Sequence, residues 1–143
     1  QIKFASRECG TGTLEILACT TKIANSEIQV TDYTDHLILP DNFTKIGYKA
    51  FYDCKGFSGE FEIPRSVTEI GSSAFQNRAG FASLEFSTEL RSIGYFTFQG
   101  CKNLISTLIL PASLKTVGTK HFALHILNML GFIAHHFDVK AYL

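Results

Sequence analysis

The stretch "SVTEIGSSAF", residues 66–75, contains an Ile followed at once by a Gly and, four residues after the Gly, by a Phe. Three further stretches repeat this arrangement, with Val in place of Ile in the last: "TKIGYKAF" (44–51), "RSIGYFTF" (91–98) and "KTVGTKHF" (115–122). The four glycines, Gly47, Gly71, Gly94 and Gly118, are 24, 23 and 24 residues apart. A fixed period of this length is typical of a repeat architecture.

Alignment on the glycines divides residues 36–122 into four units, each of which begins with an apolar–x–apolar run. This alternation predicts a short strand with one buried face. A proline follows the run in three units and Ser87 takes its place in the third. Since proline cannot continue a hydrogen-bonded ladder, we expect the strand to end there. The apolar pairs are Leu37 and Leu39, Phe61 and Ile63, Leu84 and Phe86, and Leu108 and Leu110.

The second half of each unit carries apolar residues every three to five positions, which predicts a tightly turning connector with a short helical turn. Glycine suits a bend with positive φ or a close approach to the next coil. A unit of ~23 residues cannot bury its own apolar face, but stacked copies share one core. We therefore expect a ladder of phenylalanines in that core, formed by Phe51, Phe75, Phe98 and Phe122.

The repeated pattern resembles the Treponema pallidum-type leucine-rich repeat of BspA-like surface proteins. The resemblance rests on "LILPDNFTKIGYKAFYDC" (37–54) and "FEIPRSVTEIGSSAFQN" (61–77), which recur in register. Unlike the commoner leucine-rich repeat, these units have no Asn ladder after the strand. The resemblance implies an α/β fold: a right-handed leucine-rich-repeat solenoid, curved, with a parallel sheet on its concave face. It also implies binding and adhesion without catalysis.

The two ends of the chain do not follow the repeat. Residues 1–35 alternate as strands do, which predicts an N-terminal cap or a degenerate first coil, since the terminal rung would otherwise expose the core. Residues 123–143 carry apolar residues at roughly helical spacing, which predicts a C-terminal capping helix. The alternative for this tail is a truncated continuation of the repeats, which would drive self-association.

Two of the four cysteines occupy the same position in different units. Cys54 and Cys101 are two rungs apart, which separates them by nearly ~10 Å, whereas a disulfide needs Cα atoms within ~7 Å. We therefore predict two buried thiols. Cys9 and Cys19, outside the repeat, could close a hairpin, and the sequence leaves their pairing open.

Several functional classes lack any support in the sequence. Thirteen basic and thirteen acidic residues balance, so nucleic-acid binding is not expected. No run approaches the ~20 apolar residues of a membrane-spanning helix, so membrane attachment would need an anchor outside this chain. No nucleophile motif or phosphate-binding loop is present, so we predict no catalytic residues. The histidines His121, His125, His135 and His136 have only Asp138 nearby as a further ligand, so we predict no metal and no cofactor.

The predicted strands point alternate side chains outward, on the face opposite the core. This face has an acidic centre between two isoleucines, which is either a solvated surface or a partner-binding surface. The candidate binding residues are Ile38, Glu60, Glu62, Ser83, Glu85, Thr107 and Ile109. His36 extends the row at its start. Asn42, in Asn-Phe-Thr, is a candidate acceptor for N-glycosylation.

These observations predict a protein-binding module. By resemblance, we expect an extracellular or cell-surface adhesion protein that binds host matrix proteins or other cells. The alternative is a cytoplasmic scaffold for protein–protein interaction with no host contact.

Overall fold

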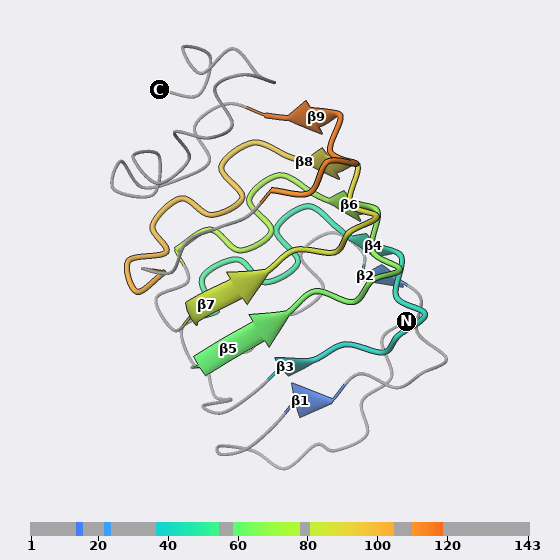
Figure 1. The fold of residues 1–143 in the computed structure, drawn as a ribbon. Helices are drawn as coiled ribbons and strands as arrows, with labels where there is room; N and C mark the ends of the chain where they lie inside the picture. Colours follow the sequence, from blue (N-terminus) through green and yellow to red (C-terminus); the bar gives the residue numbers. More distant parts are fainter. Residues whose placement is uncertain are drawn as a thin grey trace.

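The computed structural model describes residues 14–15, 22–23, 37–54, 59–77, 81–104 and 110–118, and there the chain winds as a stack of coils (Figure 1). The strands in this part of the chain are β1 (Leu14–Glu15), β2 (Lys22–Ile23), β3 (Leu37–Ile38), β4 (Lys45–Ile46), β5 (Gly59–Glu62), β6 (Glu69–Ile70), β7 (Phe81–Glu85), β8 (Ser92–Ile93) and β9 (Thr116–Val117). Every pairing between them is parallel, because each coil repeats the path of the one before.

The strands β3, β5 and β7 overlap the predicted apolar–x–apolar runs, but β5 and β7 begin before them, at Gly59 and Phe81, and all three end before the second apolar residue. β1 pairs with β3, and β5 pairs with β7. The alternation is confirmed, since Leu37, Phe61 and Leu84 are buried while Ile38, Glu62 and Glu85 are exposed. Residues 108 and 109 of the fourth predicted strand lie outside the described residues.

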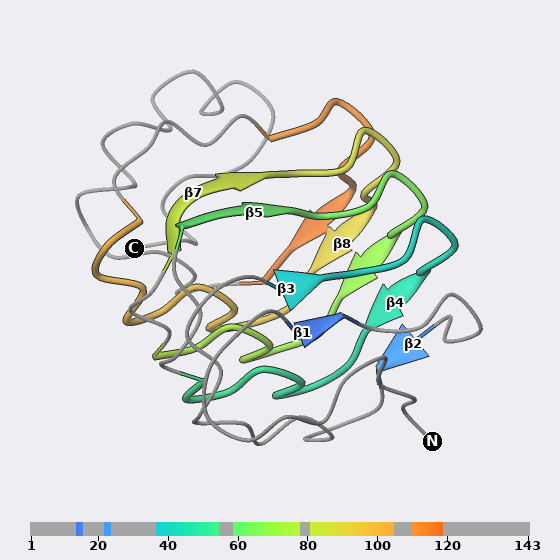
Figure 2. The same ribbon diagram turned by 90° about the horizontal axis from the view of Figure 1, so that it is seen from below.

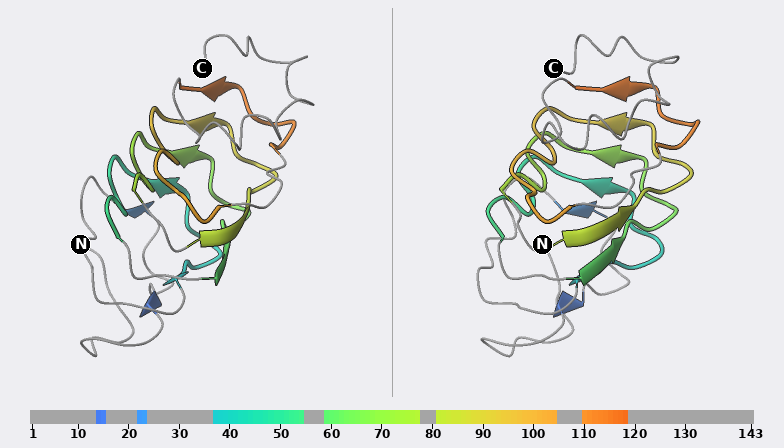
Figure 3. Two further views of the ribbon diagram at one scale, coloured as in Figure 1. Left: turned by 90° about the vertical axis from the view of Figure 1, so that its left-hand side faces the viewer. Right: turned by 60° about the vertical axis from the view of Figure 1, so that its left-hand side comes forward.

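The segment before each glycine is a strand and tight turns follow the glycine, so the predicted connector is correct in its tight turning and wrong in its short helical turn. β2, β4, β6, β8 and β9 form a five-stranded parallel sheet in that order, and no described residue is helical. Figure 3 shows these strands stacked one above another, and Figure 2 shows them across the coil from β3, β5 and β7. Each of these strands has two residues, of which the Ile or Val is directed inward. Two residues are too few for an alternating pattern to be recognised in the sequence.

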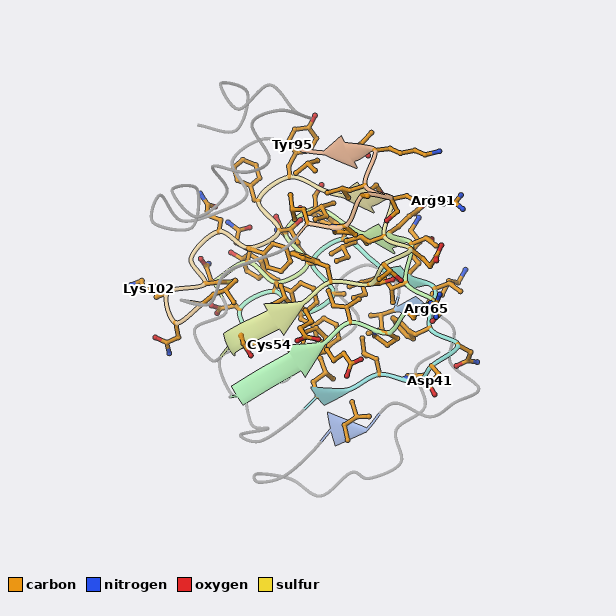
Figure 4. The ribbon with its side chains drawn as sticks, viewed as in Figure 1. Asp41, Cys54, Arg65, Arg91, Tyr95 and Lys102 are labelled. Atoms are coloured by element: carbon orange, nitrogen blue, oxygen red, sulfur yellow. The ribbon has the colours of Figure 1, made fainter. Side chains whose placement is uncertain are left out.

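A tight turn at the predicted proline position joins each of β3, β5 and β7 to the next strand of the five-stranded sheet. The carbonyl of Pro40 accepts a hydrogen bond from the N–H of Phe43 at 3.0 Å, and Pro64 and Val67 repeat it at 3.0 Å. Ser87 replaces proline and keeps the turn, since its carbonyl accepts from the Leu90 N–H at 3.2 Å. Its Oγ also donates to the Arg65 carbonyl at 2.7 Å and accepts from the Glu89 N–H at 3.1 Å. Figure 4 places Asp41, Arg65 and Arg91 along this edge of the stack.

A second turn follows each glycine. In these turns the backbone hydrogen bonds between neighbouring coils continue, although the residues do not form a strand. Alternate N–H groups donate to the next coil: Lys49 to the Ser72 carbonyl at 3.0 Å and Phe51 to the Ala74 carbonyl at 2.8 Å. This path needs left-handed backbone at non-glycine residues. These residues are Lys49, Asp53, Ser73, Asn77 and Phe96, with φ between 53° and 61°.

The phenylalanine ladder forms the centre of the core. Phe75 stacks on Phe51 with ring centroids 5.3 Å apart and on Phe98 at 5.6 Å, with the rings within 6° of parallel. Phe61 meets Phe75 edge-on at 5.5 Å. Phe51, Phe75 and Phe98 have no exposed surface, which confirms the prediction for these three; Phe122 lies outside the described residues.

The repeated glycine is required by close approach between coils and not by positive φ. A Cβ on Gly71 would lie 2.6 Å from the carbonyl carbon of Gly47, and a Cβ on Gly94 would lie 2.2 Å from the amide nitrogen of Ser72. Among the described glycines, Gly100 is the one with positive φ, at 77°. Of the two roles predicted for these glycines, close packing is therefore the correct one.

The N-terminal strands continue the stack beyond the four predicted units. Leu14 of β1 pairs with Leu37, and Ile23 of β2 pairs with Ile46. This register is that of one more coil, but most of residues 1–35 lies outside the described residues, so the cap or degenerate first coil stays a prediction. The C-terminal segment 123–143 lies outside the described residues.

Candidate functional site

The exposed side chains of β3, β5 and β7 form the predicted surface, which we call the strand face. In the β5–β7 pairing, Glu62 lies opposite Glu85, and Glu60 lies opposite Ser83. Glu62 and Glu85 are exposed and Ser83 is half-buried. Paired residues on adjacent strands are separated by ~5 Å, where like charges directly opposite are destabilising. Folding alone therefore gives no reason for the Glu62–Glu85 pair.

The remaining predicted site residues are placed only in part. Ile38, in β3, has 48% of its surface exposed. The backbone of Glu60 belongs to β5. Thr107, Ile109 and His36 lie outside the described residues. The structure thus brings Glu62, Ser83 and Glu85 together on two adjacent strands.

An open groove of about 370 Å³ lies beside the acidic pair. Its lining includes Glu62 and Glu85 from the strands, followed by Arg65, Ser87 and Thr88 from the turn where each strand ends. The carboxylates and the guanidinium of Arg65 give this groove charges of both signs, with the acidic side chains on the strand face. A basic side chain of a partner would meet two carboxylates there.

A second surface was missed in the sequence. An open groove of about 360 Å³ crosses the five-stranded sheet over its glycines, from Lys45 to Gly118, with Tyr95 on its wall. Tyr48, Tyr52 and Tyr95 are 43%, 37% and 54% exposed. The signal present in the sequence was the dipeptide Gly-Tyr, which occurs in the same position of two repeats, at Tyr48 and Tyr95.

The described residues also bear on the predicted metal ligands, cysteines and glycosylation acceptor. No cluster of three His, Cys, Asp or Glu capable of holding a metal occurs among them. Cys54 and Cys101 are buried thiols that form no disulfide, as predicted, whereas Cys9, Cys19 and the C-terminal histidines lie outside the described segments. Asn42 is exposed on the turn after β3. No helix long and apolar enough to cross a membrane is found in the part of the chain that the structure describes.

Comparisons with known proteins agree with this architecture. The fold is similar to the crystal structure of the T. pallidum Leucine Rich Repeat protein (TpLRR), with a TM-score of 0.53 and 18% identity over 80% of this chain and 77% of that one. A search of curated protein sequences gives no significant match. The family described as "BspA type Leucine rich repeat region" matches residues 8–141 in six copies, which extends past the predicted four-repeat segment at both ends. The chain therefore belongs to the BspA-type leucine-rich-repeat family, generally non-enzymatic protein-interaction modules, and folds as a leucine-rich-repeat solenoid.

Proposed function

We propose that this solenoid is a cell-surface adhesion module that binds a protein ligand through its strand face. The observation that carries the proposal is the exposed Glu62–Glu85 pair on adjacent strands. A basic side chain of the ligand would relieve the repulsion between these carboxylates and gain a charge-assisted hydrogen bond. Ile38, nearly half exposed, supplies apolar contact beside them, with Thr107 and Ile109 as the proposed continuation.

The proposed ligand is an extracellular-matrix or host-surface protein, in keeping with the surface association typical of BspA-type proteins. Asn42 is the proposed glycosylation acceptor, since it is exposed on a turn and belongs to an Asn-x-Thr triplet. The second candidate function is a cytoplasmic scaffold, which the same acidic strand face would also serve. Binding to matrix proteins is expected of the adhesion module and not of the cytoplasmic scaffold, so it distinguishes the two functions.

The test is titration by surface plasmon resonance against purified matrix proteins, immobilised one at a time. We expect at least one to bind, and we expect Glu62→Lys with Glu85→Lys to weaken that binding at least tenfold, or ~1.4 kcal/mol. The single variant Glu62→Lys should give part of this loss. Its matched control is Glu69→Lys, because Glu69 is also an exposed strand glutamate but lies on the five-stranded sheet.

The control should leave the affinity unchanged. Glu69→Lys removes an ion pair with Lys45 and places two lysines opposite each other, but exposed charge pairs of this kind change stability by only ~0–1 kcal/mol. Equal affinity of the parent and the double variant would exclude the strand face. No binding to any matrix protein would contradict adhesion and favour the scaffold.

A further inference from the structure

Arg91 and Lys115 form a pair of like charges on adjacent coils, which we call the basic pair. They lie directly before β8 and β9, and the N–H of Lys115 donates to the carbonyl of Arg91 at 2.8 Å. Both side chains are exposed. Within the described ranges the ion pair is that of Lys45 with Glu69, and no described carboxylate neutralises the basic pair. Because like charges on neighbouring strands repel, folding alone does not explain this pair either.

The acidic counterpart is the Glu62–Glu85 pair of the strand face. These two residues are directly opposite each other in the β5–β7 pairing. Arg65 lines the groove beside them, but no ion pair joins it to either carboxylate in the part of the chain that the structure describes. In both pairs the charged residues are one coil apart, or ~4.8 Å. Two carboxylates and two cations at the same spacing are complementary, since each carboxylate can meet one cation.

The two pairs lie on different sides of the coil. Glu62 and Glu85 are exposed on β5 and β7, whereas Arg91 and Lys115 come after the turn, where the chain enters the five-stranded sheet on the other side of the coil (Figure 2). One copy of the chain therefore cannot bring its own two pairs together. Contact between them requires a second copy.

The charges of the whole chain favour a second copy as the occupant. Thirteen basic and thirteen acidic residues give no net charge, so two copies approach without overall repulsion, and a net charge near zero promotes association. A purely acidic or purely basic ligand would balance one pair and leave the other unbalanced. Further copies of this chain balance both, because each copy carries the complement of each pair.

We propose that the chain associates with copies of itself, the Glu62–Glu85 pair of one copy binding the basic pair of the next. The contact joins two different surfaces, so each added copy offers a further acidic and a further basic pair, and the copies form an open series or a ring. The strand face is shared with the proposed function, so a matrix ligand and a second copy compete for it. Self-association itself does not depend on a matrix ligand.

The test is sedimentation velocity of the chain alone, over a range of protein concentrations. At an ionic strength of about 0.01 M, where the screening length is ~30 Å, the weight-average sedimentation coefficient should rise with concentration, and at about 1 M, where this length is ~3 Å, the rise should disappear. Glu62→Lys with Glu85→Lys should raise the dissociation constant at least about tenfold, and so should Arg91→Glu with Lys115→Glu. Thermal unfolding checks that both variants fold.

Mixing the two double variants gives the sharpest result. Alone, each variant presents like charges on both surfaces, which oppose association. In the mixture, the lysines at positions 62 and 85 of one variant meet the glutamates at positions 91 and 115 of the other, so association should return.

The matched control compares two single substitutions with the same change of charge. Lys102 is exposed and lies on the opposite side of the stack from Arg91 (Figure 4). Arg91→Glu should weaken self-association, and Lys102→Glu should leave the dissociation constant of the parent unchanged.

Three results would overturn the proposal. These are a sedimentation coefficient independent of concentration at low ionic strength, undiminished association of either double variant, and no association in their mixture. Binding of matrix proteins is measured separately, at concentrations where the chain is monomeric. Failure of self-association is therefore distinguishable from failure of the proposed function.

Discussion

Phe75 stands at the middle of the aromatic ladder, between Phe51 and Phe98, and has no exposed surface. Phe75→Ala would leave a cavity among rings that cannot collapse, because each is held by the coil to which it belongs. We expect the free energy of unfolding to fall by ~3–5 kcal/mol. Chemical denaturation followed by circular dichroism measures it.

The control for this change is Tyr95→Ala, an aromatic truncation at an exposed position. It should alter stability by less than ~0.5 kcal/mol, as surface substitutions generally do. If the two variants unfolded at the same denaturant concentration, the ladder would not be the centre of the core.

Gly94 illustrates a different constraint at the residue scale, contact between backbones. The Cβ added by Gly94→Ala would lie 2.2 Å from the Ser72 nitrogen, whereas the Cβ added by Gly118→Ala would lie 2.8 Å from the Tyr95 nitrogen. Overpacking costs typically ~1–3 kcal/mol, and backbone yields less readily than a side chain. We expect Gly94→Ala to lower the melting temperature more than Gly118→Ala does, and the reverse order would contradict the packing of the coils.

At the scale of the element, the turns after the glycines carry two equivalent cysteines. Cys54 is 1% exposed and Cys101 is fully buried, with Sγ 3.2 Å from the Phe75 carbonyl oxygen. Because a buried thiol in apolar surroundings is inert, both should react with iodoacetamide only after unfolding. Mass spectrometry of a non-reducing digest would show whether either cysteine carries the iodoacetamide label before unfolding. A linked Cys54–Cys101 peptide would contradict the register of the stack.

The longer strands were predictable and the shorter ones were not. β5 and β7 follow apolar–x–apolar runs, where alternation over three residues fixes which side is buried. β4 and β6 have two residues each, and so short a segment can be read equally as a turn. Their identity depends on pairing with residues 23 or 24 positions away. Left-handed backbone at Lys49 and Phe96 was also invisible, since neither residue type favours it.

For the molecule as a whole, the period of the glycines was enough to predict a stacked solenoid with a shared core. The strand face was also predictable, because Glu62 and Glu85 follow from alternation alone and the pairing of β5 with β7 confirms their positions. The groove over the glycines of the five-stranded sheet was not predictable from the sequence. It requires a second sheet and a column of glycines, which have no side chains. The spacing of the Gly-Tyr pairs in the sequence carries no information on the depth of the groove.

The central claim is that the strand face, and not the five-stranded sheet, contacts the protein ligand. Hydrogen–deuterium exchange tests it most directly, comparing the free chain with the chain bound to the matrix protein of highest affinity. Binding should slow exchange in peptides that cover Gly59–Glu62 and Phe81–Glu85, while peptides that cover Glu69–Ile70 and Ser92–Ile93 keep the rates of the free protein. Protection confined to the second pair of segments would contradict the claim.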